Sequence, residues 1–389
     1  MRIGVLTTSY PRHAEDVAGY FVRGMADALA ARGHALEVLA PLPEGVDRRS
    51  DAGAPGVSVH HVRYAPDGWR KTFYGAGVPD NVRDPRAWPG LAGFPLALWR
   101  EARARVSEWD ALISHWALPC ALVAGAVRGE RPHLAVLHSA DVHLLGALPG
   151  SATWRARVGA SATDLLFASG AHRASFLGGL AAHARADLSG RSHASAMGID
   201  PPRATRDRRT LRRELGLGRR FTALALGRLV PIKGLGHALD AVGGLDAVDL
   251  VIAGDGPQRD ALARRGARLL GAVTGEAKAE LLRAVDAVVL SSVPTRTGRT
   301  EGTPTVALEA ASYGRAIVAS EIGGLPEIFE HGRSILFVRP GDALGLRRAL
   351  RRLAGDTKLR RRLGRAAQTV ARRYYWPALA PRIEGLLQG

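Results

Sequence analysis

The chain has 389 residues, a length that accommodates two domains of ordinary size. Apolar residues make up 46% and charged residues 23%, which excludes a disordered or fibrous chain. The single cysteine, Cys120, allows neither an internal disulfide nor a cysteine-based zinc site. Neither a signal peptide nor an apolar stretch of about 20 residues is recognisable. We therefore expect a soluble, cytoplasmic protein.

The formal net charge of +18 comes almost entirely from arginine, because only four of the 54 basic residues are lysines. The densest basic runs are residues 203–220 and 347–373. These runs allow three interpretations: solvated helix faces whose arginines reflect a GC-rich genome, attraction to an anionic membrane, or nucleic-acid binding. No aromatic-rich or recognition-helix pattern accompanies the arginines, so we expect no nucleic-acid partner and keep the first two interpretations open.

The first forty residues predict a strand at 3–6, an amphipathic helix at 20–33 and a strand at 34–41. This βαβ unit predicts a parallel sheet. Further elements are predicted in chain order: strands at 111–114, 133–138 and 164–168, with a helix at 119–128 after the first of them.

Residues 199–220 contain two prolines and eight arginines with few apolar residues, so they are predicted to be a linker. A second alternation of strands and helices follows it from residue 221 to residue 338. The predicted fold class is therefore α/β, with two Rossmann-like, doubly wound parallel sheets. The expected domain limits are 1–200 and 201–370, followed by a terminal helix at 371–389.

The chemically informative loops of the second half all follow predicted strands, where open parallel sheets bind ligands. The segment GRLVPIKG at 227–234 carries Arg228 and Lys233, and AGDGP follows at 253–257. A third loop, 291–310, carries Glu301 and Glu309 and leads into a helix. Two cations together with the free N–H groups of a helix start suit a diphosphate.

Several other phosphate sites are excluded by their motifs. Neither half opens with G-x-G-x-x-G after its first strand, and there is no P-loop. No D-x-D pair is present to hold a divalent metal on a diphosphate. The charge of a departing diphosphate would then be met by arginine, lysine and a helix dipole. We expect no metal and no cofactor.

The motifs GRLVPIKG, AGDGP, EGTPTVALEAASYGRAIVAS and EIGGLPEI occur in an order and spacing that resemble family 4 retaining glycosyltransferases of GT-B fold. Glu301 and Glu309 match the E-x7-E motif of that family. The N-terminal segments TTSYPR, ISHWALP and VLHSADV also fit, and the long loop before the motif is similar to enzymes of bacterial exopolysaccharide and colanic acid synthesis. The resemblance implies two domains facing a central cleft, with the terminal helix crossing back to the N-terminal domain.

The resemblance also implies roles for single residues. Arg228 and Lys233 would hold the donor diphosphate, Glu309 the ribose hydroxyls and Glu301 the transferred sugar. Catalytic roles would fall to His138, Arg228, Lys233 and Glu301. The other donor contacts implied are Gly19, Val273, Gly302, Thr303, Pro304 and Thr305. The acceptor contacts implied are Tyr10, His115, Trp116 and Asp141.

The expected function is transfer of a sugar from a nucleotide-diphosphate donor to a glycan or polyprenyl-diphosphate-linked acceptor. The resemblance implies retention of configuration and a role in bacterial cell-surface polysaccharide synthesis, at the inner face of the plasma membrane. A sugar-nucleotide epimerase or a phosphorylase of the same fold is an alternative, although a phosphorylase would need a Schiff-base lysine. A non-enzymatic protein that binds anionic polymers or lipids is the second alternative.

Overall fold

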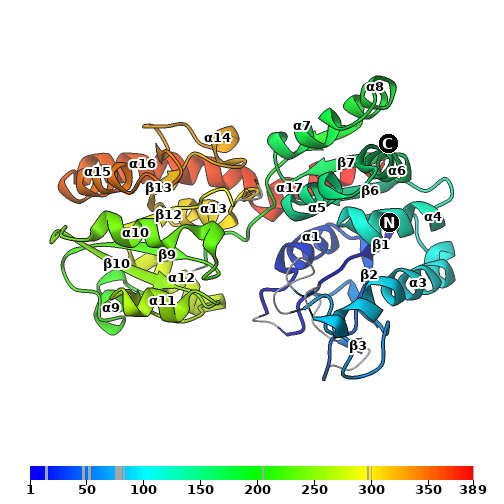
Figure 1. The fold of residues 1–389 in the computed structure, drawn as a ribbon, viewed down its shortest axis with the longest axis horizontal. Coiled ribbons are helices and arrows are strands. Elements are labelled where there is room, and N and C mark those ends of the chain that lie inside the picture. Colours follow the sequence, from blue (N-terminus) through cyan, green and yellow to red (C-terminus); the bar gives the residue numbers. More distant parts are fainter. Residues whose placement is uncertain are drawn as a thin grey trace. The chain divides into compact units, whose positions relative to one another are not determined.

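The computed structural model describes residues 1–13, 16–45, 49–50, 54–74, 81, 84–203, 206–295, 298 and 300–388. The chain forms two compact units (Figure 1). Unit 1 contains residues 1–198 and 376–389, and unit 2 contains residues 199–375. The domain limits expected from the sequence, residues 200 and 370, compare with residues 198 and 375 in the structure. Among the described residues, no helix combines the length and apolar character needed to cross a membrane.

Unit 1 is built on an eight-stranded sheet with the order β3-β4-β2-β1-β5-β6-β7-β8. All neighbouring strands pair in parallel except β3 with β4. The strand order reverses between β1 and β5, which is the place where doubly wound sheets bind ligands. The strands are β1 Arg2–Leu6, β2 Ala35–Pro41, β3 Arg49–Ser50, β4 Val57–Val62, β5 Ala111–His115, β6 His133–Leu137, β7 Asp164–Phe167 and β8 Ser192–Ala194.

Helices cover both faces of this sheet, and consecutive strand residues point to opposite faces. Val5 packs against α1 and α17, whereas Leu6 belongs to the core under α3 and α4. Trp376, at the start of α17, is buried in the first of these cores. The helices are α1 Tyr20–Ala30, α3 Trp88–Arg105, α4 Leu122–Val127, α5 Ser139–Ala147, α6 Ser151–Ser161, α7 Gly170–Gly178, α8 Ala182–Gly190 and α17 Trp376–Gly385.

Unit 2 contains a six-stranded, fully parallel sheet with the order β11-β10-β9-β12-β13-β14. The central strand β9 is buried along its whole length, as a strand covered on both faces should be. The predicted pair of doubly wound parallel sheets is thus confirmed. The strands are β9 Phe221–Leu226, β10 Val248–Ala253, β11 Arg268–Leu269, β12 Ala287–Leu290, β13 Ala316–Ser320 and β14 Leu336–Val338.

Helices α10 and α15 lie side by side on the sheet of unit 2 (Figure 1). Their apolar residues, among them Ala238 and Leu350, pack against Ala225 and Ile252 of the strands. The helices of unit 2 are α9 Arg208–Glu214, α10 Leu235–Val242, α11 Arg259–Arg264, α12 Gly275–Ala284, α13 Thr305–Ser312, α14 Leu325–Ile328, α15 Ala343–Gly355 and α16 Thr357–Ala371.

The prediction of a linker over 199–220 is wrong for residues 208–214, which form α9. Leu211 is fully buried, and Asp207 caps the helix by accepting from the backbone N–H groups of Arg209 and Thr210. Two of the arginines that suggested a solvated linker instead bind inward. Arg208 and Arg212 donate to the carbonyl oxygen of Ala284, at the end of α12.

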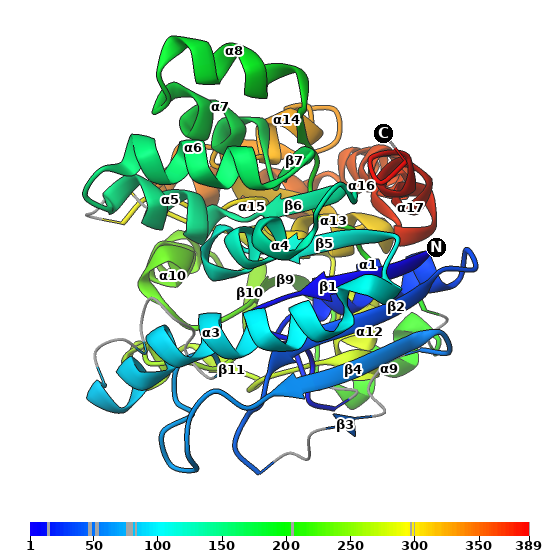
Figure 2. The ribbon, with the colours of Figure 1, turned by 90° about the vertical axis from the view of Figure 1, so that its right-hand side faces the viewer.

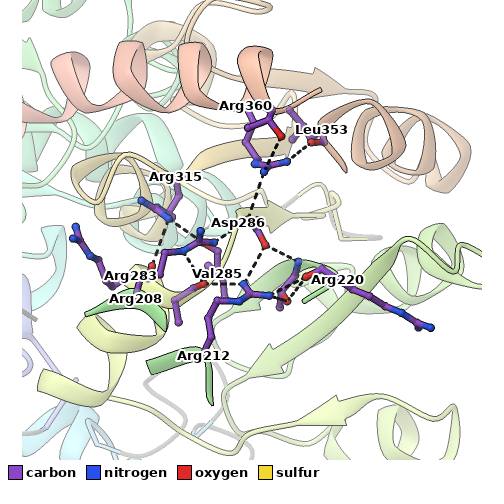
Figure 3. A network of polar contacts seen from close by, with 12 residues as sticks. Arg208, Arg212, Arg220, Arg283, Val285, Asp286, Arg315, Leu353 and Arg360 are labelled. Atoms are coloured by element: carbon purple, nitrogen blue, oxygen red, sulfur yellow. Dashed lines mark hydrogen bonds and ion pairs between the residues drawn. The ribbon is translucent and has the colours of Figure 1, made fainter. Parts of the chain in front are cut away.

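Asp286 is the acidic centre of this arginine cluster (Figure 3). Its carboxylate lies 2.8 Å from Arg208 Nη2 and 3.1 Å from Arg212 Nη1, and it accepts from the Thr222 N–H at 3.0 Å. Arg315 donates to the carbonyl of Val285. Burial by itself would raise the pKa of Asp286, but the Thr222 N–H and the Arg208 guanidinium outweigh it, so the pKa lies below its ordinary value.

We predict that Asp286→Asn destabilises the protein by about 3 kcal/mol at pH 7, because it leaves partly buried guanidinium groups without their carboxylate. The pKa of Asp286 is lower in the folded than in the unfolded chain. Its contribution is therefore present above about pH 4 and is lost as the pH falls through the folded pKa. Urea unfolding should show a difference between wild type and variant that narrows on acidification.

Asp249→Asn is the matched control, because Asp249 is 36% exposed and lies 3.8 Å from its arginine partner. Surface pairs of this kind contribute about 0–1 kcal/mol. Equal losses in the two variants at pH 7 would contradict the structural role assigned to Asp286.

Candidate functional site

The loops that follow β9 and β10 are joined at the carboxyl edge of the unit 2 sheet. The N–H of Gly227 donates to the carbonyl of Ala253 at 3.0 Å, and the N–H of Leu229 donates to that of Asp255 at 2.8 Å. The predicted segments GRLVPIKG and AGDGP therefore form one surface. Arg228 lies exposed on it, directly after Gly227.

The end of the first loop is fixed to the loop after β12. The Ser291 hydroxyl donates to the carbonyl of Lys233 at 3.0 Å, and the Val293 N–H donates to that of Ile232 at 2.9 Å. Gly234 has a φ of +58°, and a Cβ there would overlap the carbonyl oxygen of Ser291. Only glycine permits this close approach, which sets the position of Lys233.

The structure brings the predicted residues Lys233 and Glu301 together. Lys233 Nζ lies 2.8 Å from Glu301 Oε1 and 2.9 Å from Oε2, and these side chains are only 20% and 10% exposed. The Gly324 N–H donates to the carbonyl of Gly302 at 2.9 Å, which holds the Glu301 loop in place. A half-buried ion pair thus lies at the ligand-binding edge of the sheet.

A second ion pair joins Lys278 of α12 to Glu309 of α13, with Nζ 2.9 Å from Oε1. Sequence analysis predicted Glu309 but missed Lys278. The available signal was its rarity, since Lys278 is one of four lysines in a chain that otherwise uses arginine. Val273, a predicted donor contact, and the neighbouring Thr274 are partly exposed immediately before α12.

The predicted donor segment Gly302–Thr305 leads into α13. Pro304 is the N-cap residue and Thr305 the first residue of the helix, so the positive end of the helix dipole lies close to Glu301 in the sequence. Within the described residues, no group of three or more His, Cys, Asp or Glu side chains is arranged to hold a metal ion.

In unit 1, the loop after β1 approaches the start of α1 at Gly19. This glycine has a φ of +66°, and a Cβ on it would overlap the carbonyl oxygen of Ser9. The backbone N–H groups of the first turn of α1 therefore lie directly beside the carboxyl end of β1. This is the switch point of the sheet, where doubly wound sheets bind ligands.

His138 follows β6 and is the N-cap residue of α5. Its ring stacks on that of His115 with centroids 5.6 Å apart, and the ring of Phe21 packs on it at 4.6 Å. Burial lowers the pKa of His138 to about 4, and burial together with His138 lowers that of His115 well below its usual value. Both imidazoles are therefore neutral near pH 7.

The four predicted acceptor contacts differ in exposure. Tyr10, His115 and Asp141 are 0%, 1% and 2% exposed, so the structure places them in the core of unit 1. Asp141 accepts from the Ala117 N–H at 2.9 Å, and burial raises its pKa to about 7. It positions the loop after β5. Trp116, on that loop, is half-buried and is the member of this group with surface to offer a ligand.

The neutral state of His138 is testable by NMR. In a protein labelled with ¹³C-histidine, the His138 ring should stay in its neutral form between pH 5.5 and 8, because burial disfavours the imidazolium. The resonance that disappears in His138→Gln identifies the ring. A titration midpoint near 6.5, as in an ordinary histidine, would show that His138 is solvated and able to exchange protons at neutral pH.

Residues 220–356 match the family described as glycosyl transferases group 1. The whole chain is 28% identical to a GDP-mannose-dependent alpha-(1-6)-phosphatidylinositol monomannoside mannosyltransferase of Mycobacterium tuberculosis, of which it covers 98%. Over 90% of its length it is 26% identical to a putative teichuronic acid biosynthesis glycosyltransferase of Bacillus subtilis, of which it covers 89%.

Solved structures show the same fold over the whole chain. Anabaena HepE in complex with UDP superposes with a TM-score of 0.74 and 19% identity, covering 100% of both chains. Sucrose-phosphate synthase from Thermosynechococcus elongatus superposes with a TM-score of 0.79 and 18% identity, covering 100% of this chain and 98% of that one. Residues 220–356 thus match the glycosyl transferases group 1 family, and the whole chain has the fold of these solved structures, the GT-B fold.

Proposed function

We propose that the protein transfers a sugar from a nucleotide-diphosphate donor to a glycan or lipid-linked acceptor, with retention of configuration and without a metal ion. The observation that carries the proposal is the ion pair of Lys233 and Glu301 beside the start of α13. A lysine, a carboxylate and a helix N-terminus at one strand edge offer complementary groups to a sugar diphosphate.

A bound donor would compete with the ion pair for both of its side chains. Lys233 would turn from the carboxylate to the diphosphate, and Glu301 would accept from hydroxyls of the transferred sugar. As the bond from the sugar to the diphosphate breaks, negative charge grows on the leaving group. Lys233, Arg228 and the dipole of α13 would stabilise that charge.

Other residues would bind the remaining parts of the donor. Glu309 would accept from the ribose hydroxyls, with Lys278 holding its carboxylate in position. His138, neutral near pH 7, would exchange hydrogen bonds with the sugar without adding charge to the reaction centre. Retention of configuration is supported by the motif resemblance, which implies that the acceptor enters on the face from which the diphosphate leaves.

We further propose a role in bacterial cell-surface polysaccharide synthesis, on the cytoplasmic side of the membrane. Two relatives support such acceptors, since one is named for a phosphatidylinositol mannoside and another for teichuronic acid. The net charge of +18 supports contact with anionic lipid. Sedimentation with anionic and neutral vesicles, compared at low and high salt, tests that contact.

A panel of nucleotide sugars tests the reaction. The correct donor should raise the Tm by about 5 °C at a hundredfold excess over its Kd, because it binds only the folded chain. Slow hydrolysis of the same donor should continue in EDTA. Loss of activity in EDTA and its return with magnesium or manganese would refute metal independence, and an unresponsive panel would refute the donor site.

Lys233→Ala and Arg228→Ala should each lower kcat. Each removes charge stabilisation of the leaving diphosphate, which should raise the activation free energy by about 2 to 4 kcal/mol. The Tm of Arg228→Ala should change little, since its side chain is exposed. Lys358→Ala, an exposed lysine of α16, is the control and should keep full activity. Unchanged turnover in either site variant would contradict the assignment.

A further inference from the structure

Unit 1 contains a cavity of about 670 Å³ whose lining is mainly apolar. Residues of α3, α4, α5 and α6 line the cavity. Helix α4 packs against both α3 and α6, and Figure 2 shows these helices together on one side of the sheet. We call this cavity the α3–α6 groove. Its volume is that of a typical small-molecule site. None of the residues assigned above to the donor lines it.

The α3–α6 groove gathers exposed apolar side chains. Eight large hydrophobic residues are exposed in the described part of the chain, and four of them line the groove. Leu91, Leu96 and Trp99 of α3 are 42%, 49% and 36% exposed, and Leu144 of α5 is 37% exposed. Scattered exposed leucines are ordinary, but a contiguous apolar groove marks a binding surface.

The inner end of the groove reaches the candidate site of unit 1. Thr8 and Trp116, which follow β1 and β5, both line it, and the Trp116 ring lies 6.2 Å from that of His138. Trp116 has a φ of +80°, a strained conformation for a residue with a side chain. Its indole N–H is buried and has no hydrogen-bond partner in the described structure, which is uncommon for a buried donor.

Cationic groups flank the groove. The Arg103 guanidinium lies 5.7 Å from the ring centroid of Trp99, and that of Arg157 lies 5.5 Å from that of Trp154. Neither guanidinium pairs with a carboxylate of the described residues. An apolar cavity with cationic groups beside it complements an anionic amphiphile, because the cavity suits the hydrocarbon chain and the arginines suit the negative headgroup.

We propose that the α3–α6 groove binds the hydrocarbon chain of a phosphate-bearing lipid acceptor, whose glycan end then lies beside Trp116 and His138. The inference rests on the proposed function, since the glycosyl acceptor is its occupant. It adds the substrate class: an acceptor attached to a long hydrocarbon chain rather than a free sugar. The apolar walls bind the chain, and the flanking arginines favour an anionic headgroup.

A series of n-alkyl phosphates from hexyl to tetradecyl, kept below their micellar concentrations, tests the groove by calorimetry. Each methylene buried should strengthen binding about two- to fourfold, until the groove is filled and the affinity levels off. Inorganic phosphate should bind far more weakly than dodecyl phosphate. An affinity independent of chain length would overturn the proposal.

Leu96→Glu and Leu144→Glu should each weaken the binding of dodecyl phosphate at least tenfold. Both side chains are exposed, so the substitutions should leave the fold intact, as circular dichroism would check. The matched control is Leu344→Glu on α15 of unit 2, where a 64% exposed leucine lies outside the groove. Equal binding by all three variants would place the amphiphile elsewhere and refute the assignment.

Two further measurements separate other occupants. If the groove variants lose self-association in the ultracentrifuge, or lose binding to phosphatidylglycerol vesicles, while dodecyl phosphate binds as before, the face is a contact for a second copy or a membrane and the proposal fails. Donor hydrolysis is measured on the same preparations. Alkyl phosphate binding without donor turnover would refute the proposed function alone, and turnover without groove binding would refute the groove alone.

Discussion

Parallel strand pairing is the constraint on which both candidate sites depend. Because neighbouring strands run in one direction, the loops that follow them meet at a single edge of the sheet. Lys233 and Glu301 are far apart in sequence, yet their charged atoms lie 2.8 Å apart. The approach needs a loop without a side chain, which Gly234 supplies against the backbone of Ser291. The topology thus brings the loops together at this edge, and the charged side chains that they carry determine what the edge can bind.

The arginine excess has a partly structural explanation. Arg208 and Arg212 bind the carbonyl that ends α12, and Arg347 binds the carbonyls of Asp240 and Ala241 at the end of α10. A guanidinium has five donors in a fixed fork, so it can satisfy several free carbonyls that a lysine could not. The net charge therefore overstates how many cations are available to a partner. Lys233 and Lys278 stand out because lysine is rare in a chain that otherwise uses arginine.

The sequence predicted the parts of the fold that are covered on both faces. Strands such as β9 are continuous apolar runs, and the loops after them carry the charged residues. It did not predict α3, whose apolar residues include the exposed Leu96 and Trp99 and whose interior contains Pro95. It also missed the pairing of Lys278 with Glu309, because that contact depends on how α12 packs beside α13 and has no local signature.

The exposed apolar residues that prevented the prediction of α3 from the sequence also support the proposed role of this helix in binding a hydrocarbon chain. A helix that leaves leucine and tryptophan side chains 36% to 49% exposed forgoes part of the stabilisation of about 1.5 to 3 kcal/mol that full burial of a large apolar side chain provides. Trp116, at the inner end of the same groove, is held in a backbone conformation that costs a further 1 to 3 kcal/mol, roughly. Two independent departures from the most stable arrangement thus converge on one cavity. Such departures are typical of functional sites, which is why we infer a lipid acceptor from the groove rather than from the larger surface charge.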